Sequence, residues 1–319
     1  MMHRWLVLIA LACALPAAHA QAPADALQRL QRVADAAQKL DYSGVFVYQS
    51  GKQSETSRIT HIVDGGTEYE RLEVLDGSPR EVLRVNDEVK CYLPESRLLI
   101  VERRRRGQAV SFPALTAEGL KGVTNHYVIT KGPSARIAGL DSDSLVIKPK
   151  DGWRYGHRLW VDAASGLLLK AALVDERGEV LESFSFTELR IGGPVDRASL
   201  KPHGVESDWK VHDVRTADAG AVRWQFNGQP PGFLKVADMV RQGRGDGREV
   251  GHVMFSDGLA TVSVFIEPAA GRNKLASGAM TLGAVNAYKR IAGDHVFIVM
   301  GDVPPAALKA IAEGIEPKK

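Results

Sequence analysis

Three strand-like runs joined by two tight turns form the stretch from Asp151 to Phe186, and this pattern constrains the fold more than any other feature. Apolar and β-branched residues fill the runs, whereas Asp162–Gly166 and Asp175–Gly178 interrupt them. Runs of this kind, punctuated by Asp and Gly, predict antiparallel hairpins. The stretch contains no catalytic constellation, so it predicts a large surface that binds something rather than an active site.

The same strand pattern continues through most of the first half of the chain, after one helix. Apolar residues at helical spacing predict an amphipathic helix over Asp25–Leu40. From Tyr42 the apolar period changes to two, and Gly, Asp, Asn and Pro separate the runs. The predicted strands are Tyr42–Ser50, Glu55–Asp64, Thr67–Asp76, Arg80–Val85, Glu88–Leu93 and Arg97–Glu102, with more from His126 to Phe186 and one helix-permissive piece at Pro113–Lys121. About ten short strands predict an open antiparallel sheet that has to curl, with the long helix in its concave side.

Several of these strands are apolar on both faces. In Tyr42–Ser50, Val45 and Val47 point one way while Phe46 and Tyr48 point the other. A sheet covered by a helix on one face alone does not need this pattern. Two alternatives remain open: the sheet is covered on both sides, which is the more usual arrangement, or one face lines an apolar cavity.

The chain changes character after the first run of strands. Residues 192–220 hold Gly, Pro and scattered charges with little periodicity, which predicts a linker between a first domain at 21–191 and a second at 221–319. The second domain has predicted strands at Ala221–Phe226, Glu249–Phe255, Leu259–Glu267 and His295–Gly301. Ala284–Ile291 is predicted to be helical, and a last helix begins at Pro304 with Leu308, Ile311 and Ile315 on one face.

The first twenty residues predict an export signal. Arg4 precedes a short apolar core, and Ala18-His19-Ala20 is a small-x-small cleavage site before Gln21. The mature chain would keep one cysteine, Cys91, which is expected to be a small buried hydrophobe in its strand. Without Arg4, 40 of the 41 Lys and Arg residues stand against 38 Asp and Glu residues. This near-balance argues against a nucleic-acid binder.

No motif for catalysis, metal or cofactor binding stands out. The glycine-rich loop Gly243–Arg248 lacks the strand before it and the helix after it that phosphate binding requires. The histidines are not paired at metal-ligand spacing. The one strong charge run is Arg103, Arg104, Arg105 and Arg106. It is either a solvated turn or an anion site for lipid phosphates or an acidic partner segment, since guanidinium groups bind phosphate bidentately.

Several separated blocks of the sequence, in the right order, resemble one family. The blocks are Asp41–Tyr48, Glu70–Gly77, Arg154–Asp162, Trp224 with Pro231–Phe233, Phe255–Val264 and Val299–Pro305. On these blocks the chain resembles the RseB/MucB family, periplasmic regulators of the envelope-stress sigma factor E in Gram-negative bacteria. The resemblance covers nearly the whole mature chain.

The resemblance implies an α+β fold. The first domain would be a large curved open antiparallel sheet around helices, a half-barrel similar to the lipoprotein carriers LolA and LolB, and the second a smaller α/β domain. The resemblance also implies a periplasmic location and no enzymatic activity. It implies binding to the periplasmic part of an RseA/MucA-type anti-sigma factor, protection of that factor from regulated proteolysis, and release when lipopolysaccharide or another acyl lipid binds.

Three hypotheses follow for the function. In the first, a regulator docks its partner on the second domain, with Trp224, Phe233 and Phe255 as candidate apolar anchors, although most aromatic residues there are expected to be core. In the second, the first domain carries lipid or lipoprotein, which leaves the second domain unexplained. In the third, ranked lowest, a hydrolase uses His157 with Asp162, but no nucleophile is evident. The lipid sensed, the partner-binding surface and any homo-oligomer are left open by the sequence.

Overall fold

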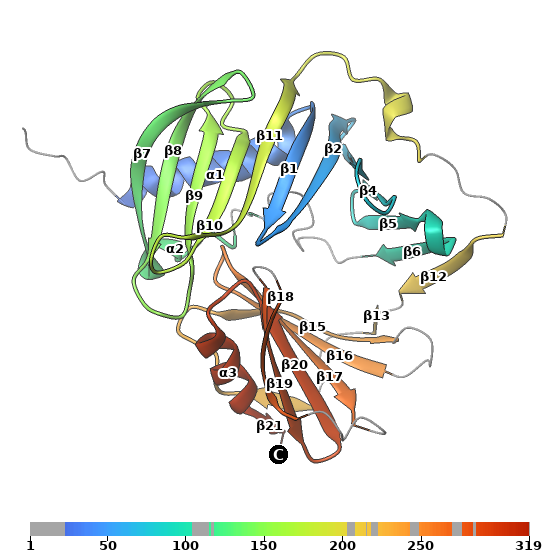
Figure 1. Ribbon diagram of the computed structural model, residues 1–319, viewed down its shortest axis with the longest axis vertical. Helices are drawn as coiled ribbons and strands as arrows, with labels where there is room; N and C mark the ends of the chain where they lie inside the picture. Colours follow the sequence, from blue (N-terminus) through green and yellow to red (C-terminus); the bar gives the residue numbers. More distant parts are fainter. Residues whose placement is uncertain are drawn as a thin grey trace, which may run out of the picture.

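Two large β-sheets, one above the other in Figure 1, form most of the described structure. The computed structural model describes residues 23–103, 115, 118–202, 208–214, 216–217, 223–242, 249–269, 276–282 and 285–318. The predicted signal at 1–20, Arg104 to Arg106 and the loop Gly243–Arg248 lie outside the described residues, as do residues 113, 114, 116 and 117 of Pro113–Lys121. Within the described part, no helix is long and apolar enough to cross a membrane.

The larger sheet has twelve strands in the order β12-β6-β5-β4-β3-β2-β1-β11-β10-β9-β8-β7. Its first six strands are β1 (Tyr42–Ser50), β2 (Gln53–Asp64), β3 (Thr67–Val74), β4 (Glu81–Val85), β5 (Glu88–Leu93) and β6 (Leu98–Arg103). The other six are β7 (Tyr127–Ile137), β8 (Leu140–Pro149), β9 (Gly156–Asp162), β10 (Leu168–Val174), β11 (Val180–Ile191) and β12 (Lys210–Val214). All neighbours pair antiparallel except β12 and β6, which are parallel. The predicted large open antiparallel sheet is therefore present.

The β10–β11 hairpin shows how local chemistry builds these strands. The carboxylate of Asp175 accepts hydrogen bonds from the backbone N–H groups of Arg177 and Glu179, at 2.9 and 2.8 Å. Gly178 follows with a φ of 82°, which a residue with a side chain adopts only at a cost. The Asp and Gly residues of the sequence therefore fix this turn, and the strands that they join are those the pattern predicts.

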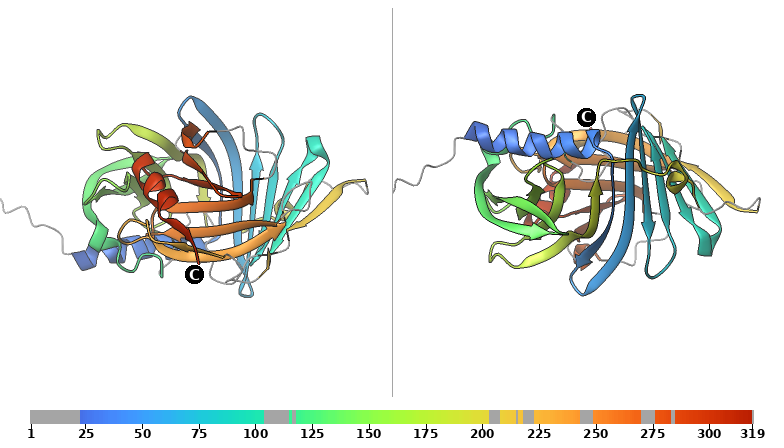
Figure 2. Two further views of the ribbon diagram at one scale, coloured as in Figure 1. Left: turned by 90° about the horizontal axis from the view of Figure 1, so that it is seen from below. Right: turned by 90° about the horizontal axis from the view of Figure 1, so that it is seen from above.

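Helix α1 (Pro23–Lys39) covers one face of the half of the sheet formed by β7 to β11. The right-hand view of Figure 2 shows it lying along the hollow of the curved sheet. Its buried residues Leu30, Val33, Ala34 and Ala37 recur at helical spacing, and the first three pack into one core with side chains of the sheet. Phe46, Phe184 and Phe186 meet edge to face in the same core, with ring centroids 4.9 to 5.9 Å apart. The helix predicted from periodicity is confirmed within two residues at each end.

Part of the segment predicted as a linker, 192–220, lies against the larger sheet. A short 3₁₀ helix, η2 (Arg197–Leu200), contacts β3, where Arg71 donates a hydrogen bond to the carbonyl of Ser199 at 2.9 Å. The ring of Trp209 lies 6.5 Å from that of Tyr92. Strand β12 then adds to the edge at β6, and the two-residue strand β13 (Thr216–Ala217) pairs with the second sheet. This segment thus contributes strands to both sheets.

The smaller sheet has seven strands in the order β13-β15-β16-β17-β20-β19-β18, all paired antiparallel. Its remaining strands are β15 (Leu234–Gln242), β16 (Glu249–Ser256), β17 (Thr261–Pro268), β18 (Gly278–Leu282), β19 (Val285–Ala292) and β20 (His295–Gly301). Helix α3 (Pro305–Glu313) covers one face with Leu308 and Ile311. A two-stranded sheet pairs β14 (Trp224–Phe226) with β21 (Ile315–Pro317), and the remaining short elements are α2 (Val123–His126) and η1 (Pro94–Ser96).

Two predictions for the second domain are wrong. In the predicted helix Ala284–Ile291, residues 285–291 lie in strand β19, because residues 285–292 pair with β20 across a tight turn and this pairing outweighs local helix preference. The last helix ends at Glu313, so Ile315 lies in β21 instead of on the helix face. In addition, β15 and β18 were not predicted. Over its described residues, the second domain is a smaller unit in which one helix packs on an antiparallel sheet.

Candidate binding surfaces

A buried ion pair joins the two domains. Arg154, which precedes β9, donates from Nε to Oδ2 of Asp257, which follows β16, at 2.7 Å. Both side chains are 0% exposed. The hydroxyl of Tyr127 on β7 donates to the same carboxylate oxygen at 2.9 Å. Because Oδ1 of Asp257 accepts the backbone N–H groups of residues 259 and 260, every lone-pair direction of this carboxylate faces a donor.

The Arg154 guanidinium is surrounded as completely as its partner. It donates to Asp151 and to the backbone carbonyl of Pro231, and it lies 4.9 Å from the centroid of the Phe233 ring. A planar guanidinium between acceptors and an aromatic face is a favourable way to bury this charge. Pro231 and Phe233 belong to the second domain, so Arg154 contacts that domain at three points.

A crevice of about 730 Å³ lies beside this ion pair, between the end of the larger sheet and the start of α3. His157 lines it, and its Nε2 atom is buried with no hydrogen-bond partner. Burial lowers the pKa of His157 to about 4, against the smaller opposing effect of Asp257. Burial also raises the pKa of Asp302, which follows β20, to about 6. The junction therefore holds a neutral imidazole and a carboxyl that is easily protonated.

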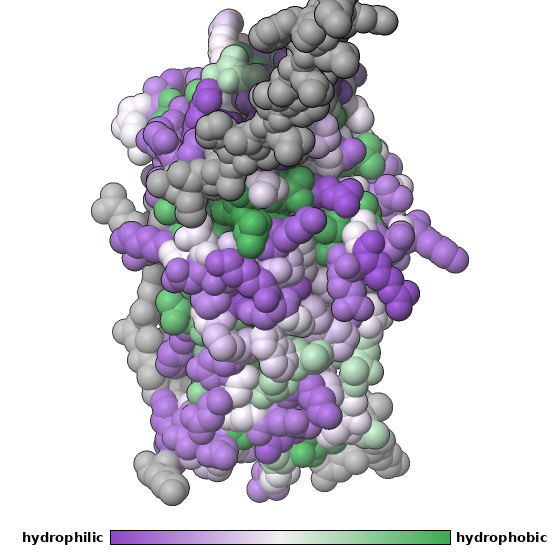
Figure 3. All heavy atoms as spheres, turned by 90° about the vertical axis from the view of Figure 1, so that its left-hand side faces the viewer, coloured by the Kyte–Doolittle hydropathy of each residue, from purple (hydrophilic) through white to green (hydrophobic). Residues whose placement is uncertain are grey.

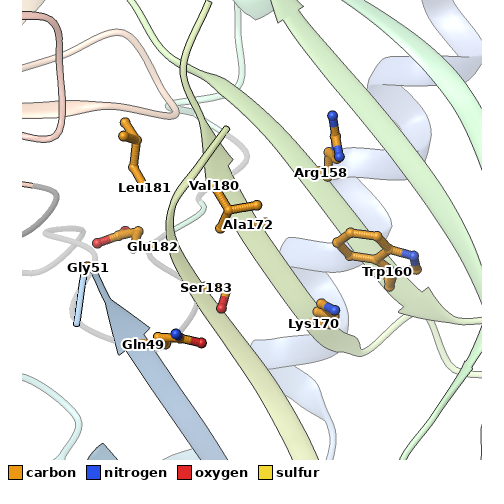
Figure 4. A pocket seen from close by; sticks show the side chains of 10 residues that line it. All are labelled: Gln49, Gly51, Arg158, Trp160, Lys170, Ala172, Val180, Leu181, Glu182 and Ser183. Atoms are coloured by element: carbon orange, nitrogen blue, oxygen red, sulfur yellow. The ribbon is translucent and has the colours of Figure 1, made fainter. Parts of the chain in front are cut away.

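A groove of about 490 Å³ crosses the face of the larger sheet that is turned away from α1. Figure 4 shows Arg158 and Trp160 on β9 close to Lys170 on β10, with α1 behind the sheet. The ammonium of Lys170 lies 4.9 Å from the centroid of the Trp160 ring. Gln49, Ser183 and Glu182 border the groove on the β1 and β11 side. A groove with two cations and an indole at one end can bind an anionic group.

Strand β1 is apolar on both faces, which indicates either a sheet covered on both sides or a face that lines an apolar cavity. Phe46 faces α1 and is buried, whereas Val45 and Val47 point to the opposite face and are only partly buried. The face of β1 that carries Phe46 is therefore part of the core beneath α1. On the side of the molecule shown in Figure 3, apolar side chains also gather in the lower part of the upper domain, surrounded by hydrophilic ones. Exposed apolar patches of this kind are typical of interaction sites.

The candidate residues from the sequence lie in different parts of the molecule. Arg103 ends β6, is largely exposed, and its Nε atom lies 3.1 Å from a carboxylate oxygen of Glu88. Phe233 and Phe255 are buried in the core of the second domain, and Trp224 packs partly buried against Phe297. Their contact with a partner stays a prediction, with only Trp224 retaining accessible surface.

The residues of the hydrolase hypothesis are not brought together. His157 packs near Tyr127 at the domain junction, with ring centroids 6.3 Å apart. Asp162, at the other end of β9, accepts hydrogen bonds from the backbone and hydroxyl of Ser165 and so caps a turn. Across the described ranges, no group of three or more His, Cys, Asp or Glu side chains is placed to hold a metal ion.

Sequence reasoning missed both the ion pair and the groove. The block Arg154–Asp162 carries part of the family resemblance and contains Arg154, Arg158 and Trp160. The sequence pattern alone predicts no role for these three residues. Alternation alone places Arg158 and Trp160 on one face of a strand. The pairing of Lys170 with Trp160, and the meeting of Arg154 with Asp257 over 103 positions, depend on register and domain packing.

Two open sheets, each covered by a helix on one face and joined by a buried ion pair, define a two-domain β-rich binding protein. Family models match both domains: the MucB/RseB N-terminal domain over residues 25–204 and the MucB/RseB C-terminal domain over residues 218–316. The chain belongs to the MucB/RseB family.

Similar proteins are regulators of sigma factors. The sigma factor AlgU regulatory protein MucB of Pseudomonas aeruginosa is 31% identical over 98% of this chain and 96% of its own. The sigma-E factor regulatory protein RseB of Haemophilus influenzae is 25% identical over 91% of each chain. A crystal structure of MucB in complex with MucA(peri) matches with a TM-score of 0.72 at 28% identity, covering 92% of this chain and all of that one. A crystal structure of MucB matches with a TM-score of 0.68 at 27% identity, over 93% and 99% of the two chains.

Proposed function

We propose that this protein binds the periplasmic region of an RseA/MucA-type anti-sigma factor and protects it from regulated proteolysis. The bound anti-sigma factor then keeps the sigma-E stress response off. One observation carries the proposal: the chain matches, over 92% of its length, a relative whose crystal structure is a complex with MucA(peri). Both domains take part in that match, so the proposal assigns a role to each.

The proposed location is the periplasm. The export signal predicted at residues 1–20, with a mature chain from Gln21, supports it. The proposed organisation is a carrier-like domain at 21–191, a linker at 192–220 and a C-terminal domain at 221–319. The proposed activity is regulatory rather than enzymatic.

Lipid sensing is the finer part of the proposal. Lipopolysaccharide or another acyl lipid would bind the first domain and lower the affinity for the anti-sigma factor. The hollow of the larger sheet supports this, because α1 covers it with small residues such as Ala34 and Ala37 that a displaced helix could exchange for an acyl chain. By reciprocal linkage, the partner must lower lipid affinity by the same factor.

The test is a binding and protection assay on the mature protein. The periplasmic region of the anti-sigma factor from the same organism is titrated by calorimetry, with and without lipopolysaccharide, and its cleavage by the regulated protease is followed. We expect a complex that slows cleavage and that lipopolysaccharide weakens. Absence of a complex in both conditions contradicts the proposal. Extraction of lipoprotein from membranes in stoichiometric amounts would favour the alternative function, a lipid or lipoprotein carrier.

A further inference from the structure

The groove of Figure 4 has a cationic end that the fold leaves uncompensated. Arg158, Trp160 and Lys170 form this end, and we call them the cationic triad. Among the described residues, neither Arg158 nor Lys170 has a carboxylate within salt-bridge distance. Other cations of the larger sheet do contact carboxylates, as Arg58 contacts Glu73 and Lys131 contacts Asp143. The triad therefore presents positive charge that makes no direct contact with a carboxylate among the described residues.

The strands hold the triad in a fixed arrangement. Arg158 and Trp160 are two residues apart on β9, so they project from the same face, and Lys170 is the register partner of Trp160 on β10. The Trp160 ring keeps the Lys170 ammonium on one side. Arg158 lies beneath the β10–β11 turn, where a side chain in place of Gly178 would come within 3.4 Å of its guanidinium. An anionic group that binds here therefore meets cations that are already ordered.

The lining residues on the β1 and β11 side of the groove include no Arg or Lys. Glu182 on β11 accepts a hydrogen bond from the hydroxyl of Tyr48, and burial together with this bond raises the pKa of Tyr48 to about 12. Val180, one of the most exposed apolar residues of the chain, lines the groove beside it. The groove thus offers a cationic end and an apolar wall, because the Glu182 carboxylate is bonded to Tyr48, which shares the α1 face of β1 with Phe46. This difference along the groove would orient an occupant.

The size of the groove suits an extended peptide. Three strand spacings separate β9 from β1, about 14 Å in all, which an extended chain spans with about four residues. Arg158 lines both this groove and the crevice at the domain junction. A segment that leaves the groove past Arg158 can therefore continue into the crevice between the two domains.

We propose that the cationic triad binds an acidic, extended segment of the anti-sigma factor's periplasmic region. This inference rests on the proposed function and adds to it a surface and a chemistry. One carboxylate of the segment contacts Arg158 and Lys170, while an adjacent side chain packs on Trp160 or Val180. Because these cations lie at the surface, they contribute to the rate of association and to its salt dependence as well as to affinity.

The test measures binding of the anti-sigma periplasmic region to the mature full-length protein by interferometry, at two salt concentrations. The double variant Arg158→Gln/Lys170→Gln should bind about tenfold more weakly at low salt, and its affinity should change less with salt than that of the wild type. Trp160→Ala should weaken binding about tenfold or more. The matched control is Arg136→Gln/Lys210→Gln, which removes the same charge from exposed sites elsewhere on the sheet. Thermal unfolding of each variant checks that it is folded.

The outcomes separate this inference from the proposed function. If the wild type does not bind, the proposed function fails. If the wild type binds but the triad variants bind as the control does, the function stands and the inference is overturned. A photo-crosslinker placed at Gln49 should capture an acidic stretch of the segment, and capture of a stretch without Asp or Glu overturns the inference. If the triad variants lose affinity only for anionic lipid vesicles, the groove belongs to a lipid headgroup and the inference is again overturned.

Discussion

At the scale of single residues, Arg154 is the clearest link between the domains. Its guanidinium is removed from water, and its acceptors come from a turn of its own domain and from two loops of the other. A buried charge with all partners present is tolerated, whereas the same charge with one partner removed is strongly unfavourable. The pair therefore fixes where the second domain docks on the first.

Asp257→Ala should destabilise the protein by about 3–5 kcal/mol, because it leaves Arg154 and the hydroxyl of Tyr127 buried without their acceptor. Urea denaturation followed by circular dichroism measures the change. The double variant Arg154→Met/Asp257→Leu removes both charges and should recover most of the loss. A single variant within 0.5 kcal/mol of the wild type would show that the buried pair does not hold the junction.

His157 should make the protein sensitive to mild acid. Its pKa is about 4 in the folded protein and about 6.5 when unfolded, so the unfolded state binds more protons between these values. The stabilisation from the neutral imidazole is complete above pH 6.5 and declines as the pH falls toward 4. The loss at pH 5 is on the order of 2 kcal/mol.

Asp302 acts in the opposite sense, since its raised pKa favours the folded state as the pH falls below about 6. The contribution of His157 is therefore obtained by comparing the wild type with a variant that lacks the imidazole but keeps Asp302. The free energy of unfolding of His157→Phe, measured at pH 7.5 and pH 5, should fall less than that of the wild type. Equal falls in the two proteins would mean that folding does not lower the pKa of His157.

At the scale of elements, turns of the second domain approach the backbone and side chains of the first domain closely. Gly258 has a φ of 97°, and a Cβ atom there would overlap the carbonyl oxygen of Gly119. A Cβ atom at Gly232 would overlap Nε2 of His126. These two glycines allow loops of the smaller sheet to approach the segment before β7. Close backbone approach is a role that only glycine fills.

Gly258→Ala should therefore loosen the domain junction. We expect a loss of stability clearly greater than that of Gly77→Ala, which also has positive φ but has open space around the missing Cβ. The control should lose about 1 kcal/mol from backbone strain alone. Denaturation midpoints measure the difference, and limited proteolysis should cut the Gly258→Ala protein faster between the domains. Equal losses in the two variants would contradict the overlap.

Elements were predicted best where the signal is local. Helix α1 and the strands β1, β5, β9 and β20 lie within two residues of their predicted ranges, because side-chain periodicity and Asp or Gly turns define them. β19 was mistaken for a helix because its local composition permits one, and only pairing with β20 makes it a strand. β12 was assigned to a linker because a single edge strand with mixed charges carries no pattern.

At the scale of the whole molecule, the two sheets are connected on both sides. The Arg154–Asp257 pair closes one side, and on the other the segment 210–217 gives β12 to one sheet and β13 to the other. Arg241 on β15 also contacts Glu102 on β6 at 3.0 Å. Two separate connections resist rotation of one domain against the other.

This arrangement predicts that the domains unfold together. Scanning calorimetry of the mature protein should show one transition whose van't Hoff and calorimetric enthalpies agree. Asp257→Ala should split it into two transitions, since one of the two connections is lost. Two transitions already present in the wild type would mean that the domains are thermodynamically independent.

The sequence by itself determined the strands, the long helix, the two-domain order and, through blocks spread along the chain, the family. These depend on periodicity, turn chemistry and residue identity, all of which are local. Only the tertiary structure decided that Arg154 meets Asp257 and that Lys170 joins Arg158 and Trp160. Such contacts follow from strand register and from the docking of two sheets, and no short stretch of sequence encodes either. For the same reason, the cationic groove became visible only when neighbouring strands placed its side chains on one face.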